Sequence, residues 1–252
     1  MTNALIRQPS PLMASACELT HLGRAPIDMA LARHQHHGYA MALRGLGLEV
    51  SVLPSLEDYA DCAFVEDTCI CLPEIAIACR PGTASRRGEV ASVAAALTNV
   101  RIFTINAPST IEGGDVLRVG RTLYVGQTTR TNAAGIAALT AIVSPFGYAV
   151  IGVKTSGTLH LKTACTALPS GTFLANLDWF DPTPFGDAGF ILVDKDEPFA
   201  GNTLTIGETI LFPAAHPRTA AKVAALGFET ALVDISEFAK AEAGLTCLSL
   251  IW

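Results

Sequence analysis

The sequence has few charged residues and no excess of positive charge. Charged side chains make up 16% of its 252 residues, and the formal net charge is −6. The low charged fraction argues against intrinsic disorder, and the negative balance argues against nucleic acid, which binds to a concentrated basic surface. Because half of the residues are hydrophobic, a chain of this length can bury a sizeable core.

Long apolar runs and targeting signals are also missing. No stretch reaches the roughly 18 apolar residues that a membrane helix needs. The polar start Met1-Thr2-Asn3 is not followed by the hydrophobic segment of a signal peptide. We therefore expect no contact with a membrane and a cytoplasmic location.

Two familiar motifs are absent. No Gly-x-Gly-x-x-Gly follows the first predicted strand, which argues against a dinucleotide-binding doubly wound sheet. The seven cysteines include no pair with the two-residue gap of a zinc or redox motif. Cys69 and Cys71 share one face of a predicted strand, but a metal site there is not favoured. Most of the cysteines are expected to be small buried hydrophobes.

Short predicted strands alternate with helices along the whole chain, and no low-complexity linker divides it. A helix recurs about once per fifty residues with strands on either side, which suggests a repeated ββαβ-like unit in a single domain, residues 1–252. The helices are predicted at 27–46, 87–97, 131–143 and 217–226. The clearest strands are predicted at 4–7, 49–53, 69–71, 75–79, 101–103, 115–119, 122–125, 148–153, 190–193, 210–212 and 231–233.

A thiol, an imidazole and flanking carboxylates are the candidate chemical groups. Cys247 lies in the run Leu245–Leu250, and His160 lies between two leucines. Either residue alone fits a buried core position. Glu112 and Asp115 flank a double glycine, which permits a sharp turn or a close approach of the backbone to another group.

Further acids and cations come from the middle of the chain. Asp61, Glu66 and Asp67 alternate with apolar residues, so some of these acids are expected to face inward, where a carboxylate needs a cation. Arg86 and Arg130 are candidate cations, or grips for a substrate carboxylate. A thiolate nucleophile, an imidazole and such carboxylates suit attack on a guanidinium carbon.

The remaining histidines are not favoured as catalytic residues. His34, His36 and His37 are predicted on the polar face of a helix, where a solvated surface is the favoured interpretation. His21 and His216 fall in loops.

Read together, the motifs resemble those of the dimethylarginine dimethylaminohydrolase family, within the guanidino-group-modifying amidinotransferase and deiminase superfamily. The stretches that carry the resemblance appear in family order and begin with Asp-Cys-Ala-Phe-Val-Glu-Asp at 61, Arg-Pro-Gly-Thr-Ala-Ser-Arg-Arg-Gly-Glu at 80, Glu-Gly-Gly-Asp-Val-Leu at 112, Arg-Thr-Asn at 130, Leu-His-Leu-Lys-Thr at 159 and Leu-Thr-Cys-Leu-Ser at 245. Each stretch is unspecific alone, but six in order cover nearly the whole chain.

The resemblance implies a five-bladed α/β propeller with a central active site, and hydrolysis of dimethylarginine or monomethylarginine to citrulline without a metal or organic cofactor. It implies that Cys247 is the nucleophile, His160 the general acid and base, and Glu112 the carboxylate that orients the histidine. The implied substrate-binding residues are Leu19 through its carbonyl, Asp61, Glu66, Asp67, Arg86, Arg130 and Glu242. The implied partner is a small guanidino compound, and a homodimer is predicted.

The stretch Lys240–Gly244 departs from the family pattern. Family members usually carry an Asp-Gly pair where this chain has Glu242 and Ala243. If Glu242 binds the substrate ammonium, its extra methylene requires a shifted backbone, and Ala243 is predicted to make that backbone less permissive than glycine would.

Two alternative functions stay open at this point. An arginine or agmatine deiminase would use the same cysteine, histidine and acids on an unmethylated guanidinium, although such enzymes are generally longer. A catalytically silent protein of the same fold would only bind a ligand or partner. The aligned nucleophile and base argue against that second alternative.

Overall fold

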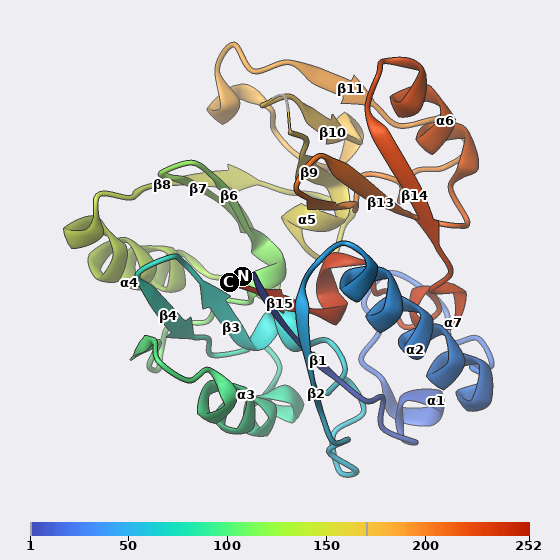
Figure 1. Cartoon of the computed structure of the whole chain (residues 1–252). Helices are drawn as coiled ribbons and strands as arrows, with labels where there is room; N and C mark the ends of the chain where they lie inside the picture. Colours follow the sequence, from blue (N-terminus) through green and yellow to red (C-terminus); the bar gives the residue numbers. More distant parts are fainter. Residues whose placement is uncertain (1, 170) are drawn as a thin grey trace.

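The structure is a computed structural model that describes residues 2–169 and 171–252. Five three-stranded sheets are arranged as blades around a central axis (Figure 1). The predicted five-bladed α/β propeller is confirmed. The strands are β1 Asn3–Arg7, β2 Glu49–Leu53, β3 Cys69–Cys71, β4 Ile75–Ala78, β5 Arg101–Thr104, β6 Val116–Val119, β7 Thr122–Gln127, β8 Ala149–Lys154, β9 Cys165–Ala167, β10 Phe173–Ala175, β11 Phe190–Leu192, β12 Leu204–Ile206, β13 Thr209–Pro213, β14 Glu229–Val233 and β15 Leu250–Ile251.

Every blade has the same pairing pattern. Its middle strand pairs antiparallel with the first strand and parallel with the third. A parallel pair requires a long crossover connection, which a helix usually supplies. The crossovers contain α2 Met29–Gly45, α3 Val90–Ala96, α4 Ala133–Val143 and α6 Pro217–Ala225.

One blade departs from the predicted ββαβ unit. Among the described residues between β10 and β11 there is no α-helix, and the crossover holds two 3₁₀ turns, Leu177–Trp179 and Thr183–Phe185. Phe185 stacks on Tyr124 of the preceding blade, with ring centroids 4.2 Å apart. Aromatic packing therefore covers this sheet where a helix covers the others.

The two ends of the chain complete one blade together. β1 pairs with β15 on one side and with β2 on the other, in the order β15-β1-β2. Figure 1 shows both termini near the centre of the ring. The ring is thus closed by backbone hydrogen bonds between the first and last strands.

Local signals explain the longest helix and the clearest hairpin. α2 begins after Asp28, whose carboxylate accepts hydrogen bonds from the amides of Ala30 and Leu31. It ends before Gly47, which has a φ of +85°. The hairpin between β6 and β7 turns at Gly120, with a φ of +57°.

The apolar core is divided among the blades into five clusters. The largest lies under α2 and includes Tyr39, Phe64 and Phe238. His36 also points inward there, and the prediction that it lies on a solvated face is wrong. Burial lowers the pKa of His36 to about 4. No helix in the described part of the chain is long and apolar enough to cross a membrane.

Candidate active site

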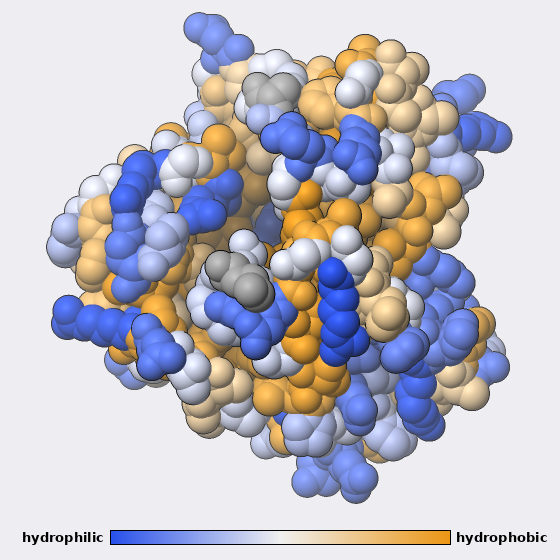
Figure 2. All heavy atoms as spheres, in the orientation of Figure 1, coloured by the Kyte–Doolittle hydropathy of each residue, from blue (hydrophilic) through white to orange (hydrophobic). Residues whose placement is uncertain are grey.

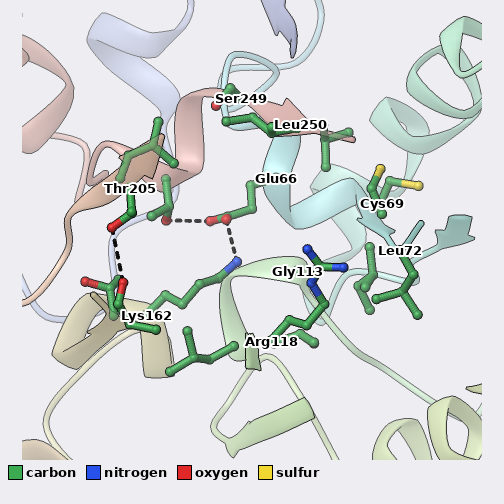
Figure 3. Close-up of a pocket in the computed structure, with 18 of the residues that line it drawn as sticks. Glu66, Cys69, Leu72, Gly113, Arg118, Lys162, Thr205, Ser249 and Leu250 are labelled. Carbon is green, nitrogen blue, oxygen red and sulfur yellow. Dashed lines mark hydrogen bonds and ion pairs between the residues drawn. The ribbon is translucent and has the colours of Figure 1, made fainter. Parts of the chain in front are cut away.

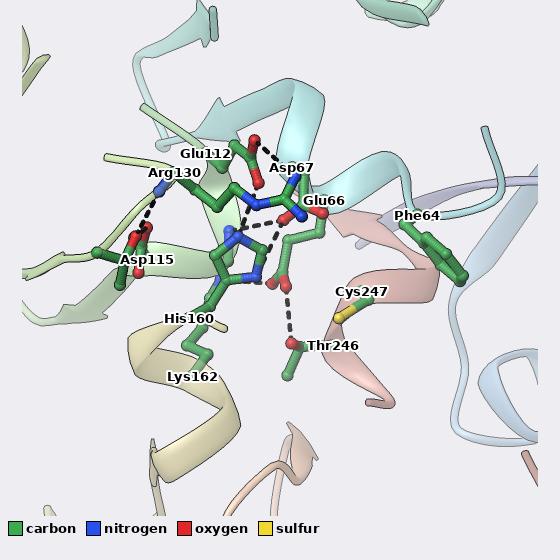
Figure 4. Close-up of polar contacts among 12 residues, drawn as sticks. Phe64, Glu66, Asp67, Glu112, Asp115, Arg130, His160, Lys162, Thr246 and Cys247 are labelled. Carbon is green, nitrogen blue, oxygen red and sulfur yellow. Dashed lines mark hydrogen bonds and ion pairs between the residues drawn. The ribbon is translucent and has the colours of Figure 1, made fainter. Parts of the chain in front are cut away.

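Four blades each place a short polar turn just before their first strand. These turns are η1 Val65–Thr68 before β3, η3 Gly113–Asp115 before β6, α5 Leu161–Ala164 before β9 and η7 Thr246–Leu248 before β15. They carry or directly follow Asp67, Glu112, His160 and Cys247. Because the blades repeat around the axis, residues far apart in the sequence meet at the centre (Figure 4).

The fifth blade supports the site without entering the cavity. Asn202 precedes β12 and is buried. Its amide nitrogen donates to Thr246 Oγ1 at 3.0 Å, and its oxygen accepts from the Thr246 amide at 3.1 Å. These bonds hold the turn that carries the adjacent Cys247.

Glu112 and His160 form a buried pair. His160 Nε2 lies 2.7 Å from Glu112 Oε2, and His160 Nδ1 lies 3.8 Å from Asp67 Oδ1. The other oxygen of Glu112 accepts from the Gly82 amide at 3.0 Å. The histidine ring is therefore fixed between two carboxylates.

The double glycine is required by close approach to these groups. A Cβ on Gly114 would lie 2.5 Å from His160 Nδ1 and 2.7 Å from Asp67 Oδ1. A Cβ on Gly113 would lie 2.0 Å from the Glu66 carbonyl oxygen. Neither glycine has a positive φ, so close approach to the Glu66 backbone at Gly113 and to His160 and Asp67 at Gly114, rather than an unusual turn, explains their presence.

The carboxylates keep His160 protonated near neutral pH. Burial alone lowers the pKa of His160, but the nearby carboxylates of Asp67, Asp115 and Glu112 outweigh it and raise the pKa to about 9. An imidazolium at this position can donate a proton to a leaving group.

Cys247 lines the same small cavity as His160. Its side chain is buried, and its sulfur accepts a hydrogen bond from the Gly244 amide at 3.4 Å. Burial, together with the charges of Asp67 and Glu66, raises the pKa of the Cys247 thiol above its ordinary value of 9.0. In the free protein Cys247 is therefore a neutral thiol near neutral pH.

Asp61 and Asp67, the predicted ligands of the guanidinium, both line this cavity, and both are already bound by the protein. Asp67 Oδ2 lies 2.6 Å from Arg86 Nη1, and its other oxygen accepts from the Gly114 amide. Burial raises the pKa of Asp67 and the cations His160 and Arg86 outweigh this effect, so the net pKa is lowered. Asp61 accepts hydrogen bonds from the Glu18 amide at 3.1 and 3.3 Å.

The two arginines differ in what they hold. Arg86 donates to Asp67, to Glu89 and to the carbonyls of Asp61 and Phe64. Few of its donors are left for the substrate carboxylate that the sequence assigned to it. Arg130 donates to two hydroxyls, Thr83 Oγ1 and Thr20 Oγ1, and lies 3.9 Å from Glu112.

Glu66 lies apart from this cavity. It lines a second cavity of about 330 Å³ around β3 and β15 (Figure 3), where it is paired with Lys162 and accepts from Thr246 Oγ1 at 2.7 Å. Near the centre of the ring, the molecular surface is hollowed (Figure 2). For Glu66 itself, burial raises the pKa of the carboxyl group, and the positive charge of Lys162 partly offsets this rise. The Glu66 side chain thus lies near the site but lines a different cavity from Asp61, Asp67, Arg86, Arg130 and Glu242.

Glu242 lines the same cavity as Cys247 and His160, but its carboxylate is bound to the backbone of residues 20–22. It also takes the left-handed conformation, with a φ of +60°, whereas Ala243 does not. The predicted constraint on the backbone therefore falls on 242 and not on 243. The side chain of Leu19 packs against the core under α2.

Asp115 is a buried site residue that was not assigned a role from the sequence. It accepts hydrogen bonds from Thr128 Oγ1, Thr131 Oγ1 and the Leu161 amide, and so fixes the turn after His160. Burial raises its pKa to about 6. The alternation of acid, double glycine and acid is the signal that could have indicated it. Glu89 had no such signal, because its role depends on Arg86.

One acid–histidine group has the spacing of a metal site. The ligand atoms of Asp67, Glu112 and His160 lie within 4.8 Å of one another. All three side chains already have protein partners, namely Arg86 and two backbone amides in addition to one another. These contacts account for the arrangement of the three side chains.

Five α/β blades with a cysteine, a histidine and carboxylates at their centre define a class, the propellers that modify guanidino groups. No protein-family model matches the chain. The N(G),N(G)-dimethylarginine dimethylaminohydrolase of Streptomyces coelicolor is 41% identical over 250 residues, which cover 98% of this chain and 95% of the relative. The Pseudomonas aeruginosa enzyme of the same name is 34% identical over 98% of this chain and 97% of its own length. The chain belongs to the dimethylarginine dimethylaminohydrolase family.

Solved structures of related proteins have the same fold. A cysteine-to-serine variant of the Pseudomonas aeruginosa enzyme, complexed with citrulline, superposes with a TM-score of 0.93 at 33% identity and covers 99% of this chain and 98% of its own. The N-terminal domain of ArgZ, a cyanobacterial arginine dihydrolase, has a TM-score of 0.88 at 18% identity and covers 100% of this chain and 98% of its own. That second likeness concerns the fold alone.

Proposed function

We propose that the chain hydrolyses Nω,Nω-dimethylarginine or Nω-monomethylarginine to citrulline and the corresponding methylamine. The observation that carries this proposal is that Cys247, His160 and Glu112 line one cavity with Asp61, Asp67 and Arg130. A nucleophile, an acid–base group, anions for a guanidinium and a cation for a carboxylate are thus present together. The relatives named above support the assignment.

Substrate binding generates the nucleophile. A guanidinium held by Asp61 and Asp67 would place a positive charge beside Cys247, and such a charge lowers the pKa of a thiol. The thiol proton then leaves to solvent. Burial is the largest cause of the raised pKa of Cys247 and the nearby acids add to it, and the positive charge of the substrate offsets the contribution of the acids.

The first half of the reaction exchanges an amine for sulfur. The Cys247 thiolate attacks the guanidinium carbon and forms a tetrahedral adduct. His160 donates its proton to the methylated nitrogen, the C–N bond breaks, and the amine leaves. A thiouronium on Cys247 remains, and His160 is neutral.

The second half adds water. Neutral His160 takes a proton from a water molecule, whose oxygen attacks the thiouronium carbon. The C–S bond then breaks, the hydroxyl proton of the adduct passes to the departing Cys247 sulfur, and the ureido group of citrulline and the resting thiol are formed. His160 returns to its protonated state, to which the buried carboxylates around it contribute.

The ends of the substrate are held by different groups. We assign the α-carboxylate to Arg130, whose hydrogen bonds go to neutral hydroxyls, and the α-ammonium to the Leu19 carbonyl. Arg86 supports Asp67 and is kept as a weaker candidate for the carboxylate. A cytoplasmic location fits seven free cysteines, one of them the nucleophile. We also propose a homodimer, to be measured by light scattering.

A product assay tests the function. The protein is incubated separately with dimethylarginine, monomethylarginine, arginine and agmatine, and citrulline, carbamoylputrescine, ammonia and the methylamines are quantified. We expect citrulline with dimethylamine from dimethylarginine, no product with Cys247→Ser, and full activity with the matched variant Cys71→Ser. Faster turnover of arginine or agmatine would assign a deiminase instead, and no turnover of any compound would favour a silent member of the fold.

A further inference from the structure

Residues 18–22, called the lid segment here, are held by three side chains that line the cavity of Cys247 and His160, called the catalytic cavity. The Glu18 amide donates to Asp61, and Thr20 Oγ1 accepts from Arg130 Nη2 at 3.1 Å. The third anchor is Glu242, whose carboxylate accepts from consecutive backbone amides. All three anchoring side chains line the cavity. The Glu18 carboxylate also accepts from Ser85 Oγ, which does not line this cavity.

The third anchor is the most extensive. The Thr20 amide lies 2.9 and 3.0 Å from the two oxygens of Glu242, and the His21 amide lies 2.6 Å from Oε1. The Leu22 amide donates to the same oxygen. Bonds from backbone amides to a carboxylate are charge-assisted and therefore stronger than neutral ones.

The backbone of Glu242 is adapted to this contact. Its φ of +60° is uncommon for a residue with a long side chain. Such a conformation persists only where surrounding contacts impose it. The bonds to the lid segment are contacts of that kind.

The catalytic cavity is small, and Glu18 of the lid segment lines it. The catalytic cavity has a volume of about 20 Å³, which is about the space of one water molecule and far too small for an arginine derivative. A neighbouring apolar cavity of about 410 Å³ shares Glu242 and Ala243 as its wall, and Leu22 and Gly23 line it as well. Movement of the lid segment away from Glu242 would join the two cavities.

We propose that Glu242 is a positioning residue that latches the lid segment closed, and that release of this latch connects the catalytic cavity with the apolar cavity. The effect of this latch on turnover rests on the proposed function. The contact between Glu242 and the lid segment is present in the free protein and does not depend on that function. Glu242 thus influences the reaction through the lid segment, in place of the direct contact with the substrate ammonium that its sequence position suggested.

Two measurements without substrate test the latch. Hydrogen exchange is followed at the amides of Thr20, His21 and Leu22, and alkylation of Cys247 by iodoacetamide reports access to the cavity. Glu242→Gly removes the carboxylate and keeps the left-handed backbone favourable. We expect exchange at these amides and alkylation of Cys247 to become about tenfold faster or more.

Glu197→Gln is the matched control. Glu197 also binds two backbone amides, those of Arg218 and Thr219, but lines neither cavity. This variant should speed exchange at those two amides only. Exchange of amides throughout the chain in Glu242→Gly would indicate that this variant is unfolded. The nearly isosteric Glu242→Gln then tests the latch, and we expect lid exchange and Cys247 alkylation to become faster by a smaller factor. Unchanged lid exchange and unchanged alkylation would overturn the latch, whatever the product assay shows.

Discussion

The pKa shifts of His160 and Cys247 disfavour a thiolate–imidazolium ion pair in the free protein. The pKa of the histidine is raised to about 9, and that of the cysteine is raised above 9.0. Near neutral pH the site therefore holds an imidazolium and a thiol. In the mechanism that we propose, this state can protonate an amine, and a cationic substrate is needed to form the thiolate. The charge balance of the site thus links activation to binding of the correct ligand.

The raised pKa of His160 makes stability depend on pH. A group whose folded pKa exceeds its unfolded value stabilises fully below the unfolded pKa, and this contribution is lost as pH rises through the folded pKa. For His160 the window runs from 6.5 to about 9. Relative to His160→Gln, the free energy of unfolding of the wild type should fall by about 3 kcal/mol across it. Urea unfolding at several pH values measures this difference, and a constant difference would contradict the assigned shift.

The two arginines should separate stability from binding. Arg86→Ala leaves Asp67 and Glu89 buried without a cation, so the free energy of unfolding should fall by about 3–5 kcal/mol. Arg130→Ala should change it much less, but should raise KM for dimethylarginine about 30-fold or more. The KM for the decarboxylated analogue of dimethylarginine should change little in Arg130→Ala. Equal losses for both compounds would show that Arg130 does not hold the carboxylate.

The turns before the first strands are the elements that build the site. Their sequences are short, and helical or strand periodicity cannot reveal them. The acid–double glycine–acid run was recognisable, because paired glycines before an apolar strand suggest close approach. The buried role of Arg86 was not, because Arg86 and Arg87 look alike in sequence, and only the fold brings Asp67 and Glu89 to one of them.

Gly114 tests the turn before β6. An added methyl group would lie 2.5 Å from His160 Nδ1, so Gly114→Ala should displace the ring and lower kcat/KM about 100-fold or more. Gly38 on the exposed face of α2 has no atom within 4 Å of an added Cβ. Gly38→Ala should leave kcat/KM unchanged and stabilise the fold by about 0.5–1 kcal/mol. Similar activity in both variants would contradict the close-approach explanation.

At the scale of the molecule, the repeated strand–helix pattern predicted the architecture well. The helices at α2, α4 and α6 and most strands lie within a few residues of their predicted ranges, because their periodicity and caps are local. The blade with β9, β10 and β11 was described only roughly, since aromatic contacts with its neighbour replace a helix. The pairing of β1 with β15 joins residues at opposite ends of the sequence, which no local pattern encodes.

The closed ring predicts that the chain unfolds as a single unit. Trp179 lies in the blade of β10, and Trp252 follows β15 in the blade that joins the termini. Variants with Trp179→Phe or Trp252→Phe each retain one fluorescent probe. Their urea transitions should have midpoints that coincide with each other and with the loss of circular dichroism. Separate midpoints would show that blades unfold independently.

The central claim is that Cys247 forms a covalent thiouronium at the guanidino carbon, and intact-protein mass spectrometry tests it most directly. His160→Gly is incubated with S-methyl-L-thiocitrulline, whose methanethiolate leaving group needs no proton from the histidine. Without His160 to activate water, the adduct should persist. The account predicts a mass increase equal to the compound less methanethiol, located on the peptide that contains Cys247 and absent when Cys247→Ser is added. An adduct on another cysteine, or none under conditions in which the wild type turns the compound over, would contradict it.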